Sequence, residues 1–285
     1  MTQTRLIRRV SHSRPTLEGA GVHLKRCFGF GDEKLFDPFL LMDDFRGDDP
    51  VDYLKGFPWH PHRGIETITY VTAGEVAHGD SMGNEGVITP GDVQWMTAGS
   101  GIIHQEMPKG DDKGRMHGFQ LWANLPSTQK MMDPRYRDVK SNQIPEVKTG
   151  DGARIKVISG RVEGKKGPVQ DIVIDPQYLD ITLPGKVEYV HPTHPGHTVF
   201  AYIIDGECSF PDTGEDRHAN NTLVLFEDGD SVRLKAGEQG TRLLLISGMP
   251  LGEPIAWYGP IVMNTDEELD LALKEYQDGT FIKHA

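Results

Sequence analysis

The chain has 285 residues, 37% of them hydrophobic, and its 30 Lys and Arg against 42 Asp and Glu give a formal net charge of −12. This acidic balance argues against a nucleic-acid backbone as a partner, because phosphate binding needs clustered cations. No apolar run approaches the ~20 residues of a membrane-spanning helix, so such a helix is excluded. The length allows one large β domain or two domains of ordinary size.

The location and redox state are inferred from the first residues and from the cysteines. Residues 1–10 lack the apolar stretch of a secretory signal, and Cys27 and Cys208 are too few for a disulfide framework or a thiolate zinc site. We therefore expect a cytoplasmic protein with reduced cysteines. The 33 Gly and 19 Pro are spread along the chain, which is typical of many short strands joined by turns.

Short strands and loops are expected between residues 5 and 50. The stretch 19–28 has a glycine turn followed by alternating residue types, which is a strand pattern. The apolar run 39–45 contains Asp43 and Asp44 near its end. We interpret these two acids as a strand end and the start of a loop, and a role in supporting metal ligands is the alternative.

The stretch 59–71 holds the first half of a candidate metal site. His60 and His62 are two residues apart in a segment that becomes β-branched and aromatic, so in a strand both imidazoles point to one face. His104 and Glu106 repeat this spacing after a glycine turn. If the two segments are neighbouring strands, three imidazoles and a carboxylate converge. That set suits a divalent first-row metal and leaves coordination positions open for a substrate.

Chance is the alternative explanation, because the chain contains 12 histidines. The second pair argues against it, since it recurs at the next turn-bounded strand. Strands separated by glycine turns at short spacing indicate an antiparallel barrel or sandwich for this half of the chain. Further along, Gln120 and Trp122 share one face of the strand pattern at 118–126 and either line the pocket or fill the core.

The polar stretch 127–153 is expected to connect two domains, since Pro134 disfavours a long helix there. We place the N-terminal barrel with the metal site at residues 1–130. The C-terminal barrel, without a metal, is placed at residues 131–285. Residues 201–207 resemble residues 69–75 in sequence, and this internal duplication implies two similar barrels.

The metal ligands do not recur in the second half. His194 aligns with His62, but the positions of His60 and His104 are not matched by histidine. His191, His194 and His197 follow one another at a spacing of three, which does not place them on one strand face. We therefore interpret these three as loop residues rather than as a second metal site.

The C-terminus shows a helix pattern. Thr265 and Glu268 form a capping box, with Thr265 as the N-cap. Apolar residues follow at helical spacing, and Gly279 is a fitting stop. We expect this helix to pack on a barrel. The apolar positions are Leu269, Ala272, Leu273 and Tyr276.

Four segments of the chain resemble the pirin family, within the cupin superfamily. They are residues 57–64, 95–104, 120–126 and 134–136, and the likeness extends over nearly the whole chain, including the helix. The resemblance implies an all-β bicupin of two antiparallel, jelly-roll-type barrels with a C-terminal α-helix. It also implies one metal, often iron, in the N-terminal barrel.

The resemblance assigns this metal to His60, His62, His104 and Glu106. Glu66 stands where general cupins carry a glutamate ligand, but pirins resemble a variant in which Glu106 supplies the carboxylate. Glu66, like Gln120 and Trp122, is therefore expected near the ligands or the pocket rather than on the metal. We expect Fe(II), although the same donors accept nickel, zinc, manganese or copper.

Several bacterial pirins show quercetin 2,3-dioxygenase activity, and the resemblance implies the same activity here. A flavonol's 3-hydroxyl and 4-carbonyl oxygens would chelate the metal, and Glu106, or water near it, would remove the 3-hydroxyl proton. Reaction with O₂ would then open the heterocycle and release CO. The implied partners are a small aromatic substrate and O₂, without nucleic acid or membrane.

Other functions remain open at this stage. Eukaryotic pirins resemble redox-sensing cofactors of transcription factors, which implies a non-enzymatic, iron-binding sensor that regulates a transcription factor or a metabolic enzyme by protein contact. A dioxygenase for another substrate is a second alternative. A sugar-binding or storage-type cupin with a dead site is disfavoured, because all four ligand positions are present. We expect a monomer, since a bicupin already pairs two barrels in one chain.

Overall fold

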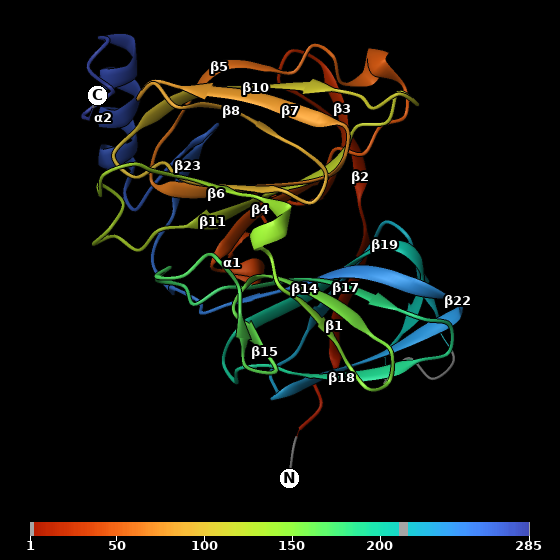
Figure 1. Ribbon diagram of the computed structural model, residues 1–285. Coiled ribbons are helices and arrows are strands. Elements are labelled where there is room, and N and C mark those ends of the chain that lie inside the picture. Colours follow the sequence, from red (N-terminus) through yellow and green to blue (C-terminus); the bar gives the residue numbers. More distant parts are fainter. Residues whose placement is uncertain (1–2, 211–215, 285) are drawn as a thin grey trace. The chain divides into compact units, whose positions relative to one another are not determined.

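The computed structural model of the chain describes residues 3–210 and 216–284. It is built mainly of antiparallel strands, with a helix near the C-terminus, and the chain divides into two compact units (Figure 1). This architecture confirms the expected all-β bicupin fold with a C-terminal helix.

Each of the two units contains residues from both halves of the chain. The first barrel, as we call it, comprises residues 14–141 and 251–285, and the second barrel comprises residues 1–13 and 142–250. The expected boundary at residue 130 therefore differs from the observed division at both termini. Sequence periodicity identifies a strand or a helix but does not show which sheet it joins.

The first barrel contains two antiparallel sheets. The larger consists of β2 (Arg14–Glu18), β3 (Val22–Phe28), β4 (Phe39–Asp44), β6 (Ile65–Ala73), β9 (Val93–Thr97), β11 (His117–Asn124) and β12 (Arg135–Val139). Its strand order is β12-β9-β6-β11-β4-β3-β2. The smaller consists of β5 (Phe57–His62), β7 (Glu75–Asp80), β8 (Glu85–Ile88) and β10 (Ile102–Lys109), in the order β5-β10-β7-β8. Short helical turns are α1 (Glu33–Phe36), η1 (Pro50–Asp52) and η2 (Ser141–Gln143).

Polar residues separate two of the apolar clusters inside the first barrel. Side chains alternate along β6, so Ile65, Thr69 and Val71 share the face toward the interior. Ile65 belongs to one cluster and Val71 to the other. Thr69 lies between them in sequence and bonds to Glu106 of the opposite sheet. The interior is thus polar at the place where the candidate ligands enter it.

The C-terminal segment packs against the first barrel through β23 (Ala256–Tyr258), β24 (Ile261–Met263) and α2 (Asp266–Gln277). The capping box is confirmed: Glu268 N–H donates to the Thr265 hydroxyl, and the Glu268 carboxylate accepts from Thr265 N–H. Leu269 and Ala272 are buried on the inner side of the helix. At Gly64, φ is +77° and a Cβ would lie 1.9 Å from the Val262 carbonyl oxygen, so the close approach of β24 requires glycine.

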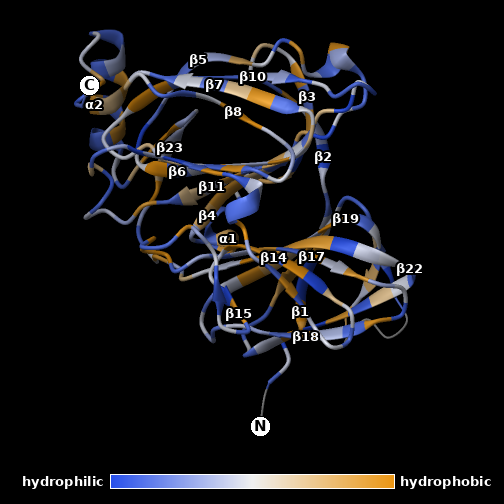
Figure 2. Cartoon of the chain, viewed as in Figure 1, coloured by the Kyte–Doolittle hydropathy of each residue, from blue (hydrophilic) through white to orange (hydrophobic). Residues whose placement is uncertain are grey.

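The second barrel is one continuous antiparallel sheet. Its strands are β1 (Ile7–His12), β13 (Glu146–Lys148), β14 (Arg154–Ser159), β17 (Gln177–Leu183), β18 (Glu188–Pro192), β19 (Thr198–Ser209), β20 (His218–Ala219), β21 (Thr222–Phe226) and β22 (Ser231–Gly248). The order is β1-β21-β19-β22-β17-β14-β13, with β18 on β22 and β20 on β19. A separate ribbon joins β15 (Arg161–Val162) to β16 (Lys165–Lys166). Polar and apolar residues alternate in the first part of β22, at residues 231–236, and residues 243–246 are all apolar; Figure 2 shows β22 in patches of different hydropathy.

Apolar side chains fill the interior of the second barrel. They include Val157, Leu179, Ile181, Val199, Ile203, Val224, Leu243 and Leu245, all buried. The reading of His191 as a loop residue is corrected, because it lies in β18 and is fully buried. His191 Nδ1 lies 3.1 Å from Tyr189 OH, and His191 Nε2 lies 2.7 Å from the Gln177 amide oxygen. His194 and His197 do lie in the loop before β19.

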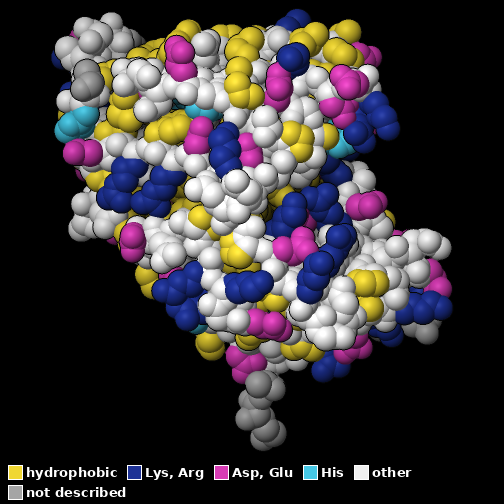
Figure 3. Space-filling model, in the orientation of Figure 1, with side chains coloured by type: hydrophobic (Ala, Val, Ile, Leu, Met, Phe, Trp, Pro, Cys, Tyr) yellow, Lys and Arg dark blue, Asp and Glu magenta, His cyan; other side chains and the backbone are white. Residues whose placement is uncertain are grey.

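The surface carries both signs of charge. On the face drawn in Figure 3, Lys and Arg side chains are interspersed with Asp and Glu. Neither helix in the described part of the chain has the length and apolar character needed to cross a membrane.

Candidate metal centre

Three imidazoles converge inside the first barrel, as the paired spacing predicts. His60 and His62 project from β5, and His104 projects from the neighbouring strand β10, where it is paired with His60 in the sheet register. One ligand nitrogen from each ring lies within 4.8 Å of the other two. The ring centroids are 4.4 Å apart for His60 and His104, and 5.0 Å apart for His62 and His104.

The hydrogen bonds of these rings favour the tautomers that metal binding needs. His60 Nδ1 lies 2.9 Å from the Pro58 carbonyl oxygen, and His62 Nδ1 lies 3.2 Å from the Pro260 carbonyl oxygen. A carbonyl oxygen can only accept, so both Nδ1 atoms carry a proton, and in the neutral form of each ring Nε2 then presents a lone pair. Those two Nε2 atoms face each other at 3.1 Å. Two lone pairs at that distance repel each other, and a cation bound to both nitrogens would offset this repulsion.

His104 completes the donor set. Its Nε2 is buried and has no hydrogen-bond partner among the described residues. Burial is the main cause that lowers the pKa of both His62 and His104 well below the ordinary histidine value, and neighbouring imidazoles lower it further. Both rings are therefore neutral at pH 7, which is the ligand form of imidazole. The residues present fit a metal ion held by three nitrogens.

Glu106 lies two residues beyond His104 on the same inward face of β10, and it is buried. Thr69 Oγ1 donates to its carboxylate at 3.0 Å, and Gln120 Nε2 lies 3.3 and 3.2 Å from its two oxygens. Trp122 Nε1 donates to Gln120 Oε1 at 3.1 Å, which fixes the orientation of that amide. The compact group of potential ligand atoms in the described residues holds the three imidazoles without this carboxylate.

Glu66 lies apart from the imidazoles. It alternates with Thr69 along β6, so its side chain is on the opposite face of the sheet. Its carboxylate accepts hydrogen bonds from Trp95 Nε1 at 3.1 Å and from Thr97 Oγ1 at 2.7 Å. Burial raises the pKa of Glu66 above the usual value. Among the described residues, its hydrogen bonds join β6 to β9 and do not reach His60, His62 or His104.

A cavity of about 750 Å³ is lined by His60, His62 and Glu106. Aromatic rings form much of its wall, including Phe30, Phe57, Trp122, Trp257 and Tyr258. The Trp122 and Trp257 ring centroids are 6.2 Å apart, and the Trp122 ring meets the His62 ring edge-on at 5.1 Å. A pocket with flat apolar walls suits a planar aromatic ligand.

The C-terminal segment contributes to this cavity in a way that the sequence does not reveal. Residues 257–260 line it, and Pro260 supplies the carbonyl that faces His62 Nδ1. Arg63, the residue after that ligand, donates to Glu275 Oε2 at 2.7 Å and to the Phe281 carbonyl oxygen at 2.8 Å. Its guanidinium carbon lies 4.2 Å from the centre of the Phe281 ring. No local sequence pattern connects residues about 200 positions apart.

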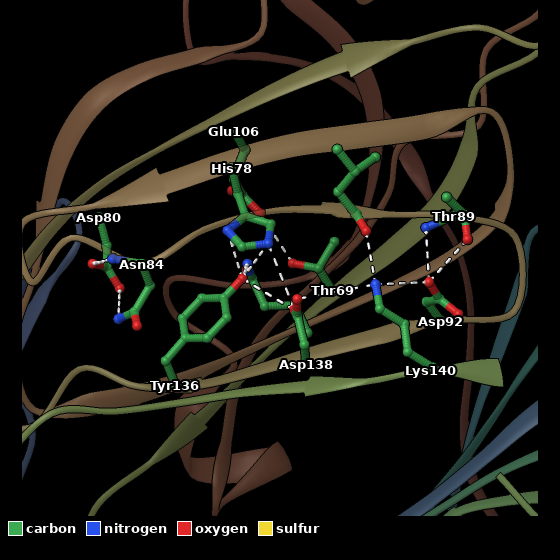
Figure 4. Close-up of polar contacts among 12 residues, drawn as sticks. Thr69, His78, Asp80, Asn84, Thr89, Asp92, Glu106, Tyr136, Asp138 and Lys140 are labelled. Carbon is green, nitrogen blue, oxygen red and sulfur yellow. Dashed lines mark hydrogen bonds and ion pairs between the residues drawn. The ribbon is translucent and has the colours of Figure 1, made fainter. Parts of the chain in front are cut away.

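A second polar network in the first barrel centres on Tyr136 and His78. Tyr136 OH contacts both nitrogens of His78, the Gln94 amide nitrogen and Asp138 Oδ1. Figure 4 labels Tyr136, His78 and Asp138. His78 lies on β7 opposite Glu106 on β10 in the sheet register. Pro134–Tyr136 carried only a family resemblance in the sequence, without a signal for this contact.

Comparison with known proteins adds a family to this geometry. The family profile described as Pirin matches residues 21–123, and that of the Pirin C-terminal cupin domain matches residues 178–282. A Pirin-like protein of Caulobacter vibrioides is 42% identical over 283 residues, which cover 97% of this chain and 99% of that protein.

Solved structures agree with this match. The crystal structure of quercetin 2,3-dioxygenase from Acinetobacter baumannii has a TM-score of 0.90 and 31% identity, covering 98% of this chain and 99% of that chain. A bacterial pirin from Escherichia coli, solved in complex with nickel(II), shares the fold at a TM-score of 0.65 and 21% identity, covering 85% of this chain and 99% of that chain.

Proposed function

Since the chain belongs to the pirin family of bicupin proteins, we propose that it is a metal-dependent dioxygenase that opens the heterocycle of a flavonol such as quercetin with O₂. The observation that carries this proposal is the convergence of three imidazoles beside a carboxylate at an aromatic cavity of about 750 Å³. The similarity to a protein named quercetin 2,3-dioxygenase supports the choice of substrate class.

We assign the metal to His60, His62 and His104, and Glu106 is proposed as a fourth ligand that also acts as the base. Fe(II) is the expected ion, and nickel, zinc, manganese or copper fit the same donors. When bound, the metal would supply Lewis acidity and open positions for oxygen donors of the substrate. The Nδ1 contacts of His60 and His62 with carbonyl oxygens hold these rings in the required orientation.

The protein's own groups then position the substrate and move its proton. The aromatic walls bind the flat ring system and exclude water. Glu106 accepts the proton of the 3-hydroxyl group, while Thr69 and Gln120 hold its carboxylate in place. In the overall reaction, both bonds of carbon 3 to its ring neighbours break and that carbon leaves as CO. Both atoms of O₂ remain in the ring-opened product.

Variants of Glu106 test the assignment of the base. In Glu106→Ala, quercetin turnover should be lost. In the wild type, one CO should be released for each O₂ consumed, as the overall reaction requires. Glu75→Ala, an exposed glutamate on β7, serves as the control. Full activity of Glu106→Ala with its metal retained would refute the role of Glu106 as base.

A redox sensor that binds iron without catalysis is the second candidate, and one observation favours it. β5 carries His60 and His62 at the edge of its sheet, and Trp59 beside them is 53% exposed. An exposed aromatic residue next to a metal ligand could report the iron state to a transcription factor or a metabolic enzyme. Equal binding of the ferric and ferrous proteins to every partner, or binding unchanged in Trp59→Ala, would exclude this role.

A further inference from the structure

A row of polar side chains crosses the inner face of the larger sheet in the first barrel. Thr69 on β6 is paired with Gln120 on β11, Gln120 with Asp43 on β4, and Asp43 with Arg26 on β3. Directly paired residues on antiparallel strands share a face, so all four project toward the same side. Neighbouring strands are about 4.8 Å apart, and the row therefore extends over roughly 14 Å.

The two ends of this row have different chemistry. At one end, Thr69 and Gln120 hold Glu106 beside the imidazoles. At the other end, Arg26 bonds to Asp43 through Nε at 2.9 Å and Nη2 at 2.8 Å, and Nη2 also lies 2.8 Å from Glu18 Oε1. Glu18, Arg26 and Asp43 line the same cavity as the imidazoles. The cavity is therefore polar at both ends of the row, with aromatic rings in its wall.

The hydrogen-bond donors and acceptors of this second cluster suit a hydroxylated aromatic ring. One guanidinium stands against two carboxylates, so the cluster carries excess negative charge and repels an anionic ligand group. In the described part of the chain, Arg26 bonds through Nε and Nη2, which leaves Nη1 as a donor. Glu18 and Asp43 offer acceptor lone pairs. Two acceptors beside one donor complement phenolic hydroxyls, which donate and accept.

We propose that Glu18, Arg26 and Asp43 form a second polar subsite, which binds phenolic hydroxyl groups on the part of the substrate that does not reach the metal. This inference rests on the proposed flavonol-binding function and specifies the substrate class. The pocket selects polyhydroxylated, uncharged aromatic compounds over aromatic carboxylates and over rings without hydroxyl groups. Burial raises the pKa of Asp43 to about 6 despite the bonded guanidinium, so Asp43 is mainly ionised at pH 7 and accepts hydrogen bonds.

Binding of three flavonols to the zinc-loaded protein tests the subsite without turnover. The probes are quercetin, with two adjacent hydroxyls on its pendant ring, kaempferol, with one, and galangin, with none. Affinity is measured anaerobically from quenching of tryptophan fluorescence, since Trp122 and Trp257 line the cavity. The wild type should bind quercetin at least about tenfold more tightly than galangin, as expected for hydrogen bonds to charged groups. Kaempferol should fall between them.

Variants assign this preference to the cluster. In Glu18→Gln and in Arg26→Gln, quercetin affinity should approach that of galangin, while galangin affinity itself stays within about twofold of the wild type. Glu75→Gln removes a comparable ion pair with Lys109 on the surface and should keep the full preference. Unchanged galangin binding also shows that each variant has folded.

The outcomes separate this inference from the proposed function. If the wild type binds none of the three flavonols, the proposed function fails. If it binds all three with equal affinity, or if Glu18→Gln and Arg26→Gln keep the wild-type preference, the second subsite is refuted and flavonol binding stands.

Discussion

Trp122 connects the aromatic wall of the cavity with the Glu106 carboxylate. Its indole N–H donates to Gln120 Oε1, and this bond turns the amide so that Nε2 faces Glu106. Without that donor the amide can rotate by half a turn and present its oxygen to the carboxylate, which is repulsive. Trp122 thus acts on Glu106 through Gln120.

We predict that Trp122→Phe lowers kcat for quercetin by about tenfold, because the ring stays but the donor is lost. Metal content should remain at the wild-type level, since the three imidazoles are untouched. Steady-state O₂ uptake together with metal analysis measures both quantities. Trp59→Phe, at an exposed position, should match the wild type. A wild-type kcat in Trp122→Phe would show that Gln120 needs no orienting donor.

At His191, burial is the cause that shifts the pKa of the imidazole. Burial lowers its pKa to about 4, from the usual 6.5, because the fully buried ring is disfavoured in its charged form. Between these two values the unfolded chain binds a proton that the folded chain does not. The free energy of unfolding of the second barrel therefore falls as pH drops from 6.5 to 4, and it is unaffected by this group above 6.5.

Protonation of His191 should lower the free energy of unfolding by about 3 kcal/mol between pH 7 and pH 4. Urea unfolding followed by circular dichroism at pH 7 and at pH 4.5 measures it in the wild type and in His191→Gln. The variant is less stable at pH 7 but should lose less stability on acidification. His23→Gln, at an exposed histidine, should keep the wild-type pH dependence. Parallel pH curves for the wild type and His191→Gln would contradict the prediction.

At the scale of elements, the C-terminal segment fixes the strand that carries His60 and His62. Arg63 is buried and joins β5 to α2 through Glu275 and to the chain after it through Phe281. Lys130 is also buried, and its Nζ donates to the carbonyl oxygens of Gly64 and Val262. These contacts place Pro260 where its carbonyl meets His62.

Removal of this connection should weaken the metal site. Arg63→Ala leaves Glu275 without its buried partner, and we expect a loss of about 3 kcal/mol in the free energy of unfolding and at least tenfold weaker zinc binding. Denaturant unfolding and competition with a chelator measure the two effects. Arg115→Ala, which breaks an exposed pair with Asp111, should change neither. Zinc affinity equal to the wild type in Arg63→Ala would separate the helix from the metal site.

The elements differ in how far the sequence predicts them. Period-two patterns and glycine turns predict the strands, and the capping box predicts α2, because these signals are local. The shared orientation of His60 and His62 is also local, since i and i+2 residues share a strand face, whereas the approach of His104 requires β10 to pair with β5. The roles of Arg26, Asp43, Tyr136 and Pro260 depend on strand order and on long-range docking, so no sequence window contains them.

Glu66 shows that a position matched by family resemblance need not bring a side chain to the expected place. It follows His62 by four residues and is placed by resemblance near the ligands, yet it lies on the outer side of β6, bonded to Trp95 and Thr97. Side chains of successive strand residues alternate between faces, so a shift of one position moves a carboxylate from one side of a sheet to the other.

At the scale of the whole molecule, tryptophan fluorescence can report one barrel selectively. All four tryptophans, Trp59, Trp95, Trp122 and Trp257, lie in the first barrel, and the second barrel has none. A ligand that binds only the folded first barrel stabilises it by about 2.7 kcal/mol at 100 times its Kd. We predict that zinc raises the midpoint of the fluorescence transition in urea and that His62→Ala abolishes this rise. A rise retained in His62→Ala would place the metal elsewhere.

The most direct test of the account is anaerobic purification followed by metal analysis and O₂ uptake with quercetin for the wild type, His62→Ala and the exposed-site control His23→Ala. We predict one iron per chain and quercetin-dependent O₂ uptake in the wild type and in His23→Ala, and neither in His62→Ala. A stoichiometric metal without O₂ uptake would contradict the dioxygenase and favour the sensor. A wild-type protein that binds no metal would contradict the converging imidazoles as a metal centre.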